Sequence, residues 1–485
     1  PVQFSMRNFA NQEALKNAAG LEKGSFRLSA ESENDYVTFS WQGHFAQTAP
    51  TGNVTINNMA AEHLVQLLAP DTATAAEGTA DIRGRLALHR SKDAPLGYTF
   101  DKGSIQFSDL ALTDGAATDK DDQAWLHSTS TRMSAVTLES TAATIDTLSL
   151  GNIFVEGATM HLRAGAPPAL LQKLSNSSAN RLEGLDFKGN IDIVRQHPDA
   201  PMLKLRNIHL QANELGQANG DGNTPLNTTD NNFAFTGATG ASGSITAKGR
   251  IGRAPLRGTI DIAFSSLPLS MVLPLPDSAS YALSSDSTVN GRGTYTLDSK
   301  TFEGAVDIGQ TTLQDSANNR QYSFDRAVLA EFAMDLENGS YHGEKVIVKD
   351  IAVTEDNTGN RPFSSDGASL SSFSLEGMDL KLGDLSFART AFVLPPGFPE
   401  DIASFLDTIA LPVDIDRFEM FGTVDVLGND QQPERFIEDF RCTLEPLQQK
   451  HPAGENVSLT ARLHDQGNIS ATGRLSLGPL QSKLQ

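Results

Sequence analysis

Cysteine is almost absent from this sequence of 485 residues, which contains Cys442 alone. One cysteine excludes an internal disulfide framework, and it excludes zinc or iron–sulfur sites built from several thiolates. Basic residues are also few, since 38 Lys and Arg stand against 59 Asp and Glu and give a net charge of −21. Because such an acidic chain repels phosphate backbones, we expect no nucleic-acid partner.

Long apolar runs and catalytic motifs are missing as well. No stretch reaches the roughly 18 apolar residues that a membrane-spanning helix needs. The chain has no phosphate-binding loop, no dinucleotide fingerprint and no nucleophile elbow in front of a helix. The ten histidines are scattered without metal-ligand spacing. We therefore expect a protein that is not an enzyme and that has no cofactor, no metal site and no catalytic residue.

What the sequence does contain is period-two alternation of apolar and polar residues, which predicts half-buried β-strands. Gly, Asn and Asp punctuate these runs, as turns between antiparallel strands require. The alternating apolar sets are Val54/Ile56, Leu86/Leu88, Ile105/Phe107, Ile191/Ile193, Leu203/Leu205, Ile260/Ile262/Phe264, Leu380/Leu382, Val424/Val426 and Leu475/Leu477.

Helical patterns are few and short. Residues 58–68 place several apolar side chains on one side, residues 168–174 begin with a proline, and residues 399–409 repeat the helical spacing. Each segment spans two or three turns, which is typical of a helix that covers part of a sheet.

An internal repeat is the most specific feature. When the sequence is shifted by 206 positions, Gly43 falls on Gly249, Gly52 on Gly258 and Pro70 on Pro276. One inserted residue later, Arg83-Gly84-Arg85 falls on Asn290-Gly291-Arg292. A third copy begins near Ile469. Such repeats predict modules that bury their open sheet edges by stacking.

The repeat divides the chain into expected modules. They are a first β module over residues 1–165, a second over 166–300 with a short leading helix, an inter-repeat β segment over 301–411, and the truncated start of a third repeat over 412–485. The expected fold is mainly β: an elongated, curled antiparallel sheet that forms a groove (a β-taco), built from tandem repeats with a few short helices.

The segment from Ser244 to Ile251, followed by Pro255-Leu256, the strand 258–262 and Pro276-Asp277, resembles the AsmA-like superfamily of TamB- and YhdP-type bridge-like lipid transfer proteins. The segment 417–477 resembles it equally. The resemblance implies a periplasmic β-groove, anchored to the inner membrane of a Gram-negative cell in the full-length protein, of which this chain is an internal fragment. It also implies that phospholipid acyl chains move along the groove toward the outer membrane, in outer membrane biogenesis.

On this hypothesis, the apolar strand faces line the groove and shield acyl chains from water. Its partners are phospholipid acyl chains and, through parts outside this fragment, the inner and outer membranes; the sequence names no partner protein. The alternation alone also fits a closed sandwich core. One alternative function is a structural or adhesive β-repeat surface protein without lipid cargo, and a carbohydrate-acting enzyme ranks third because only two tryptophans are available. The expected lining residues are Ile105, Phe107, Leu203, Leu205, Ile260, Ile262, Phe264, Leu380, Leu382, Val424 and Val426.

Overall fold

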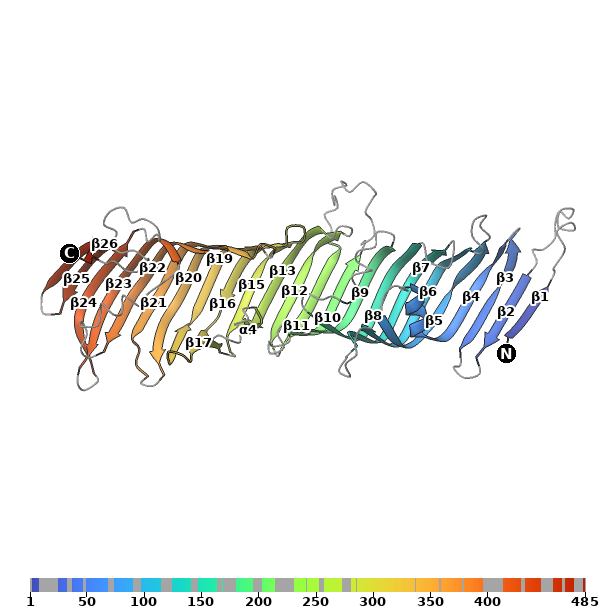
Figure 1. Ribbon diagram of the computed structural model, residues 1–485, viewed down its shortest axis with the longest axis horizontal. Coiled ribbons are helices and arrows are strands. Elements are labelled where there is room, and N and C mark those ends of the chain that lie inside the picture. The colour runs from blue at the N-terminus through green and yellow to red at the C-terminus, as the bar shows by residue number, and fades with distance from the viewer. Residues whose placement is uncertain are drawn as a thin grey trace. The chain divides into compact units, whose positions relative to one another are not determined.

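The computed structural model divides into two compact units, unit 1 (Pro1–Ala241 and Ile245–Ile260) and unit 2 (Ser242–Ser244 and Asp261–Gln485). Strands account for most of the described residues in both units (Figure 1). The expectation of a mainly β protein is therefore confirmed. The described residues are 2–7, 25–32, 37–46, 49–68, 74–89, 97–114, 124–140, 147–163, 168, 180–194, 203–213, 231–240, 242–252, 257–272, 281–284, 286–335, 337–356, 359–376, 379–395, 413–428, 432–445, 457–464, 467–474 and 483–484.

Unit 1 is a sheet in which strands that follow each other in the chain pair side by side, from β1 to β11. All of these pairs are antiparallel except β8 with β9, which is parallel. The strands are β1 (Val2–Arg7), β2 (Ser25–Glu31), β3 (Thr38–Ala46), β4 (Ala49–Ala60), β5 (Thr74–His89), β6 (Gly97–Asp114), β7 (Leu126–Ser140), β8 (Thr147–Arg163), β9 (Asn180–Val194), β10 (Leu203–Asn213) and β11 (Phe233–Thr239).

Two further strands, β12 (Gly243–Gly252) and β13 (Arg257–Pro268), contain the points where the chain passes between the units. In unit 2, neighbours again pair antiparallel, except for the parallel pair β22–β23. Strands β17 and β18 form a side hairpin between β14 and β20. The strands are β14 (Tyr281–Leu283), β15 (Thr288–Thr296), β16 (Thr301–Ile308), β17 (Thr311–Asp315), β18 (Arg320–Phe324), β19 (Arg326–Asp335), β20 (Ser340–Glu355), β21 (Phe363–Glu376), β22 (Asp379–Leu394), β23 (Val413–Leu427), β24 (Pro433–Leu444), β25 (Val457–Leu463), β26 (Asn468–Arg474) and β27 (Lys483–Leu484).

Among the described strands, each unit thus shows one parallel pair, and a parallel pair needs a crossover connection because its strands run in the same direction. The connections are the segments 164–179 after β8 and 395–412 after β22. The helices predicted over 168–174 and 399–409 fall in these two connections and, apart from Pro168, lie outside the described residues, as does the predicted strand pair Leu475/Leu477.

The third predicted helix exists but begins later than the pattern indicated. Helix α2 spans Ala61–Leu68, whereas Asn58, Asn57 and Met59 belong to strand β4. The prediction placed the start of the helix too early because the apolar side chain of Met59 fits both periods. Asn58 has a φ of 56°, so the strand ends in a bulge before the helix starts.

The repeat is visible in the order of elements. The series β3, β4, α2, β5 in unit 1 corresponds to β12, β13, α4 (Leu269–Val272) and β15 in the second copy. The structural register differs from the sequence alignment by two residues. A Cβ atom built on Gly43 would lie 2.4 Å from the Cα of Gly52, and one built on Gly249 would lie 2.7 Å from the Cα of Ile260, not of Gly258.

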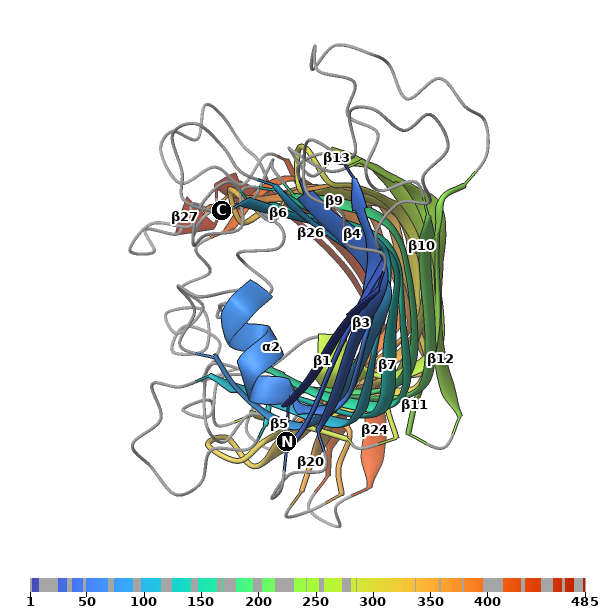
Figure 2. The same ribbon diagram turned by 90° about the vertical axis from the view of Figure 1, so that its right-hand side faces the viewer.

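Bulges bend the strands at recurrent positions. Residues in the left-handed region interrupt the ladders of β4, β6, β10 and β22, at Asn58, Lys102, Asn207 and Arg389 respectively. An extra residue in one strand increases the local twist and turns the sheet. The strands of unit 1 accordingly curve around helix α2 (Figure 2).

Candidate functional site

Two apolar rows cross the sheet of unit 2 at right angles to its strands. Each row takes one side chain from each of β16, β19, β20, β21, β22, β23, β24 and β25, and register partners in neighbouring strands share a face of the sheet. The first row is Val306, Leu329, Val346, Leu370, Leu385, Phe418, Leu444 and Val457. The second row is Ile308, Ala327, Val348, Ala368, Phe387, Met420, Cys442 and Leu459.

The apolar rows of unit 2 are only half-buried. Every member of the first row and all members of the second except Ala327 keep part of their surface exposed to solvent. Strands pack about 4.8 Å apart, so eight of them carry each row across roughly 34 Å. The rows therefore form a continuous apolar surface whose side chains, apart from Ala327, are partly accessible to solvent.

The opposite face of the same strands is charged. Arg326 makes two hydrogen bonds with Asp307, of 2.8 and 2.5 Å, and Lys345 Nζ lies 3.1 Å from Glu331 Oε1. Arg389 and Asp366 form a further exposed pair. Exposed pairs of this kind stabilise a fold by at most about 1 kcal/mol each. Their main consequence is that the sheet of unit 2 has one apolar and one hydrophilic face.

Unit 1 has matching rows. The first row is Phe39, Ile56, Ile82, Ile105, Met133, Ile153, Leu185, Ala212 and Phe233. The second row is Ala80, Phe107, Thr131, Val155, Phe187, Leu210 and Phe235.

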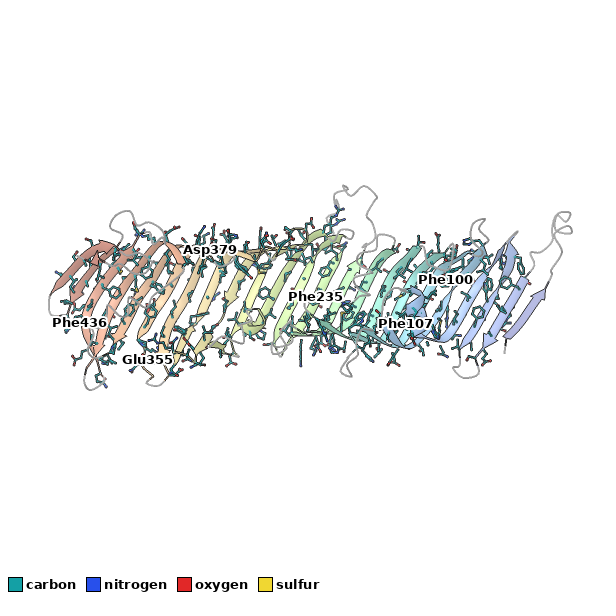
Figure 3. The ribbon with its side chains drawn as sticks, in the orientation of Figure 1. Phe100, Phe107, Phe235, Glu355, Asp379 and Phe436 are labelled. Atoms are coloured by element: carbon teal, nitrogen blue, oxygen red, sulfur yellow. The ribbon has the colours of Figure 1, made fainter. Side chains whose placement is uncertain are left out.

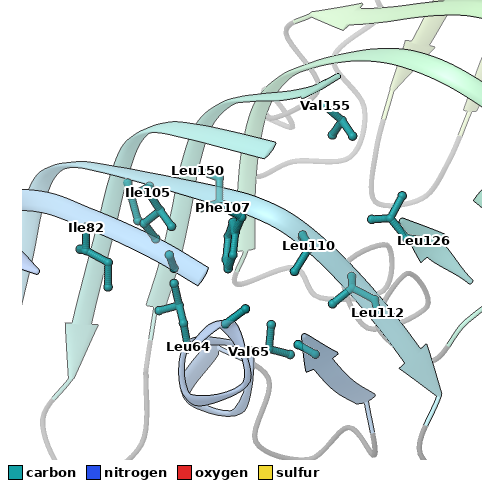
Figure 4. Close-up of a cluster of buried hydrophobic side chains, with 14 of the residues drawn as sticks. Leu64, Val65, Ile82, Ile105, Phe107, Leu110, Leu112, Leu126, Leu150 and Val155 are labelled. Carbon is teal, nitrogen blue, oxygen red and sulfur yellow. The ribbon is translucent and has the colours of Figure 1, made fainter. Parts of the chain in front are cut away.

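Part of this surface is covered by helix α2. The helix presents Leu64 and Val65 to Ile82, Ile105 and Phe107 (Figure 4). Ile105 and Phe107 each retain 1% of their surface, and Leu64 retains 2%. The described core of unit 1 is therefore closed under α2, although Met133 and Ile153 further along the same row stay half-buried.

Phenylalanine rings on the apolar face lie against glycines in the same or a neighbouring strand. The ring of Phe100 (Figure 3) leaves no room for a Cβ atom on Gly84 or Gly103. In unit 2, the ring of Phe373 occupies the corresponding space at Gly343. A ring over glycine buries backbone that would otherwise face an open surface. This packing explains why some of the many Phe and Gly residues of the sequence occur on neighbouring strands.

The predicted lining residues are divided between the units. In unit 1, Ile105, Phe107 and Leu205 are buried, whereas Leu203 and Ile260 are half-buried. In unit 2, the half-buried members are Ile262, Phe264, Leu380, Leu382 and Val426, and Val424 is buried with 9% of its surface exposed.

Within unit 2, the predicted residues of β22 and β23 lie on both sides of the apolar rows. Leu380 and Leu382 precede the row residues Leu385 and Phe387 along β22, and Val424 follows Met420 along β23. Together with the rows they widen the apolar face. Ile105 and Phe107 differ from the half-buried lining residues of unit 2, because helix α2 covers them.

Sequence reasoning named none of the residues in the two apolar rows of unit 2 as lining residues. The alternation Val346/Val348, Leu385/Phe387 and Phe418/Met420 is present in the sequence and could have identified them. The spacing of three between Leu382 and Leu385 breaks the period of two, which hides the continuity of the strand.

The polar chemistry of the described residues is sparse. In the part of the chain that the structure describes, no three His, Cys, Asp or Glu side chains gather as metal ligands would. Over the same residues, no helix has the length and apolar character needed to cross a membrane. Burial raises the pKa of the Cys442 thiol, which lies in the second apolar row of unit 2.

Comparison with protein-family models, with curated proteins and with solved structures returns no match.

Proposed function

We propose that the apolar rows line a trough that shields phospholipid acyl chains from water while the lipid moves between two membranes. The observation that carries this proposal is the half-exposed state of the rows in unit 2. An aliphatic side chain left half-exposed forgoes part of the stabilisation that burial gives, and two aligned rows of such side chains are more than the isolated exposed residues of an ordinary surface.

The energetics favour a hydrocarbon cargo. Removing one methylene group from water contributes about 0.8 kcal/mol. An acyl chain that lies across several strands would cover many methylene groups at once, even if one of its sides stays in water. The contact needs no hydrogen bonds and no catalytic residue, which suits a surface made of Val, Leu, Phe and Met.

Long antiparallel strands support a groove more than a β-helix, whose rungs use short strands of about 3–5 residues in parallel. Strands β6 and β8 have 18 and 17 residues. Bulges that turn each strand support a curled sheet, so we infer a β-groove of the AsmA-like kind. From the same resemblance we propose a periplasmic location, an inner-membrane anchor in the full-length protein, and transport toward the outer membrane.

A structural or adhesive role without lipid cargo is the second candidate. The observation that favours it is the closed packing of α2 on Ile82, Ile105 and Phe107, because a covered stretch of apolar face is an ordinary core. The two candidates differ in what the purified protein carries, so one experiment separates them.

The experiment combines lipid mass spectrometry with site-specific photocrosslinking on strand β20. A photoreactive amino acid at Val346 would face the trough, whereas the same group at the adjacent Ile347, with 47% of its surface exposed, would face away. We expect phospholipid in the organic extract and a crosslinked lipid adduct from position 346 but not from 347. A lipid-free extract together with equal, background labelling at both positions would contradict the proposal and favour the structural role.

A further inference from the structure

A second candidate site lies on the polar face of unit 1, away from the apolar rows. Strands β2 to β6 border a cavity there of about 1350 Å³ that is open to solvent. The residues that alternate with the buried Phe26, Trp41 and Val54 supply its polar side chains. The cavity is therefore separated from the proposed acyl-chain surface by the thickness of the sheet.

Cationic side chains dominate this cavity, which we call the basic cavity. Arg27, Arg83, Arg85 and Lys102 line it, together with the imidazole of His44. None of the four cations pairs with a carboxylate among the described residues; Arg85 donates a hydrogen bond of 3.3 Å from Nε to Thr51 Oγ1. In a chain with a net charge of −21, a group of four cations that form no ion pair in the described part of the chain creates a local positive field.

The sheet register determines how these groups are arranged. Arg83 and Arg85 are two residues apart on β5 and share a face, and Lys102 follows Asp101, the register partner of Arg85. Arg27 lies on β2 at the other side of the cavity. Three strand spacings separate it from Arg85, a distance of about 14 Å. Two carboxylates are close, Asp101 opposite Arg85 and Asp81 two residues before Arg83 on β5, and against four cations they leave a positive excess.

Neutral hydrogen-bonding groups lie between the two cationic sides. Gln42 and Asn53 connect Arg27 to Arg85 in the register, and Thr55 and Ser104 flank Arg83. Amide and hydroxyl groups beside guanidinium groups are the donors that bind phosphate oxygens. The combination is suited to a compact anion with several oxygens.

The second copy of the repeat carries less of this charge on the strand that corresponds to β5. By the matching bulge hydrogen bonds of Asn58 and Ser266, Asn290 takes the place of Asp81, so that Arg292 takes the place of Arg83 and Thr294 that of Arg85. Asn290 has a structural role there, since its Oδ1 accepts a hydrogen bond of 2.8 Å from the backbone N–H of Ser266. Strand β15 of the second copy thus carries one arginine where β5 carries two.

We propose that the basic cavity binds the phosphate group of a phosphate ester, with Arg83, Arg85 and Lys102 as the primary contacts. Either a soluble phosphate ester or a phospholipid headgroup would present this chemistry. The proposal is independent of the acyl-chain trough, because it concerns the opposite face of the sheet and different residues.

The test uses the full chain and measures binding of glycerol 3-phosphate by isothermal titration calorimetry. A flotation assay adds phosphatidylcholine vesicles with and without 20% phosphatidylglycerol. The double variant Arg83→Gln with Arg85→Gln removes two exposed guanidinium groups, and Arg292→Gln is the matched control in the second copy. We expect the double variant to weaken binding by about tenfold or more, since two charge-assisted contacts are lost, and the control to leave it unchanged.

Binding of glycerol 3-phosphate alone would assign the site to soluble esters, and binding of the anionic vesicles alone would assign it to headgroups. Equal binding by wild type and double variant, an equal loss in Arg292→Gln, or no binding of either probe would overturn the proposal. Circular dichroism and melting temperature identify a folding defect, and Lys102→Gln then provides an independent variant at the same site.

Discussion

The ring of Phe264 lies against the backbone of Gly291, so that a Cβ atom built on Gly291 would lie 2.3 Å from Cζ of the ring. Gly291 is therefore required by the close approach of a neighbouring side chain. The same relationship recurs in unit 2 at Gly343, where the ring of Phe373 would lie 2.1 Å from such an atom. These contacts hold large apolar rings flat on a sheet face that is otherwise half-exposed.

The substitution Gly291→Ala tests this packing. The new methyl group would displace the ring of Phe264, and we expect the free energy of unfolding to fall by about 1–3 kcal/mol. Phe264→Ala alone should also destabilise, and the double variant should lose less than the sum because the methyl group then has space. Chemical denaturation measures all three, with Gly309→Ala as control, since its Cβ atom would approach nothing closer than 3.3 Å. Additive losses would contradict the contact.

A second prediction concerns the bulge at Asn58. Its backbone N–H donates a hydrogen bond of 2.9 Å to Asp81 Oδ1, and in the second copy the N–H of Ser266 donates to Asn290 instead. Because Asn fulfils this role in the second copy, Asp81→Asn should retain stability. Asp81→Ala leaves the N–H without its partner and should cost about 1–2 kcal/mol in the free energy of unfolding. If both variants lost equal stability, the charge of Asp81 and not its acceptor oxygen would be the relevant property.

The bulges also explain what the sequence could and could not predict. Strict alternation identified strands wherever a run such as Ile105/Phe107 continues without interruption. A left-handed residue such as Asn207 changes the phase, because Leu205 and Ile208 are three residues apart yet are both buried. The predicted start of the helix, at residue 58, was too early for the same reason. The bulge at Asn58 still belongs to the strand.

Other properties of the candidate site depend on contacts between distant residues. The closure of Ile105 and Phe107 requires α2 to fold back onto β5 and β6, which alternation within β6 does not indicate. The two-residue register shift between the copies was equally hidden, because the Gly52 to Gly258 match in sequence suggested a different pairing. Nothing in the spacing of Arg83 and Arg85 revealed the basic cavity, since the cavity also needs Arg27 from β2 and Lys102 from β6.

A third prediction concerns acid stability. Asp315 and Asp335 each begin a turn and accept hydrogen bonds from the side chain and the backbone N–H of an asparagine three residues later. The Asn318 side chain lowers the pKa of Asp315, and the Asn338 backbone N–H lowers that of Asp335. A lowered pKa in the folded state means that the stabilisation is complete above the unfolded value, about 3.9, and is lost as the pH falls through the folded value.

We therefore expect unit 2 to lose stability below about pH 4, where unfolded aspartate takes up protons before the folded turns do. The double variant Asp315→Asn with Asp335→Asn removes both titrating groups, so its stability should be lower at pH 7 and should depend less on pH. Denaturant midpoints between pH 7 and pH 2 measure this difference. A pH dependence identical to that of the wild type would assign acid sensitivity to other carboxylates.

The last prediction uses Cys442 as a reporter of the apolar rows. Its thiol is half-buried between Met420 and Leu459 in the second row of unit 2, and burial raises its pKa. Because the thiolate is the reactive form, a maleimide should react more slowly than with a free cysteine at neutral pH and accelerate as the pH rises. An acyl chain in the trough would also block access, so phosphatidylglycerol-loaded protein should react more slowly than delipidated protein. Ile347→Cys in a Cys442→Ser background is the control, because position 347 faces the opposite side and should react equally in both states. Equal rates at Cys442 with and without lipid would place the hydrocarbon elsewhere than on these rows.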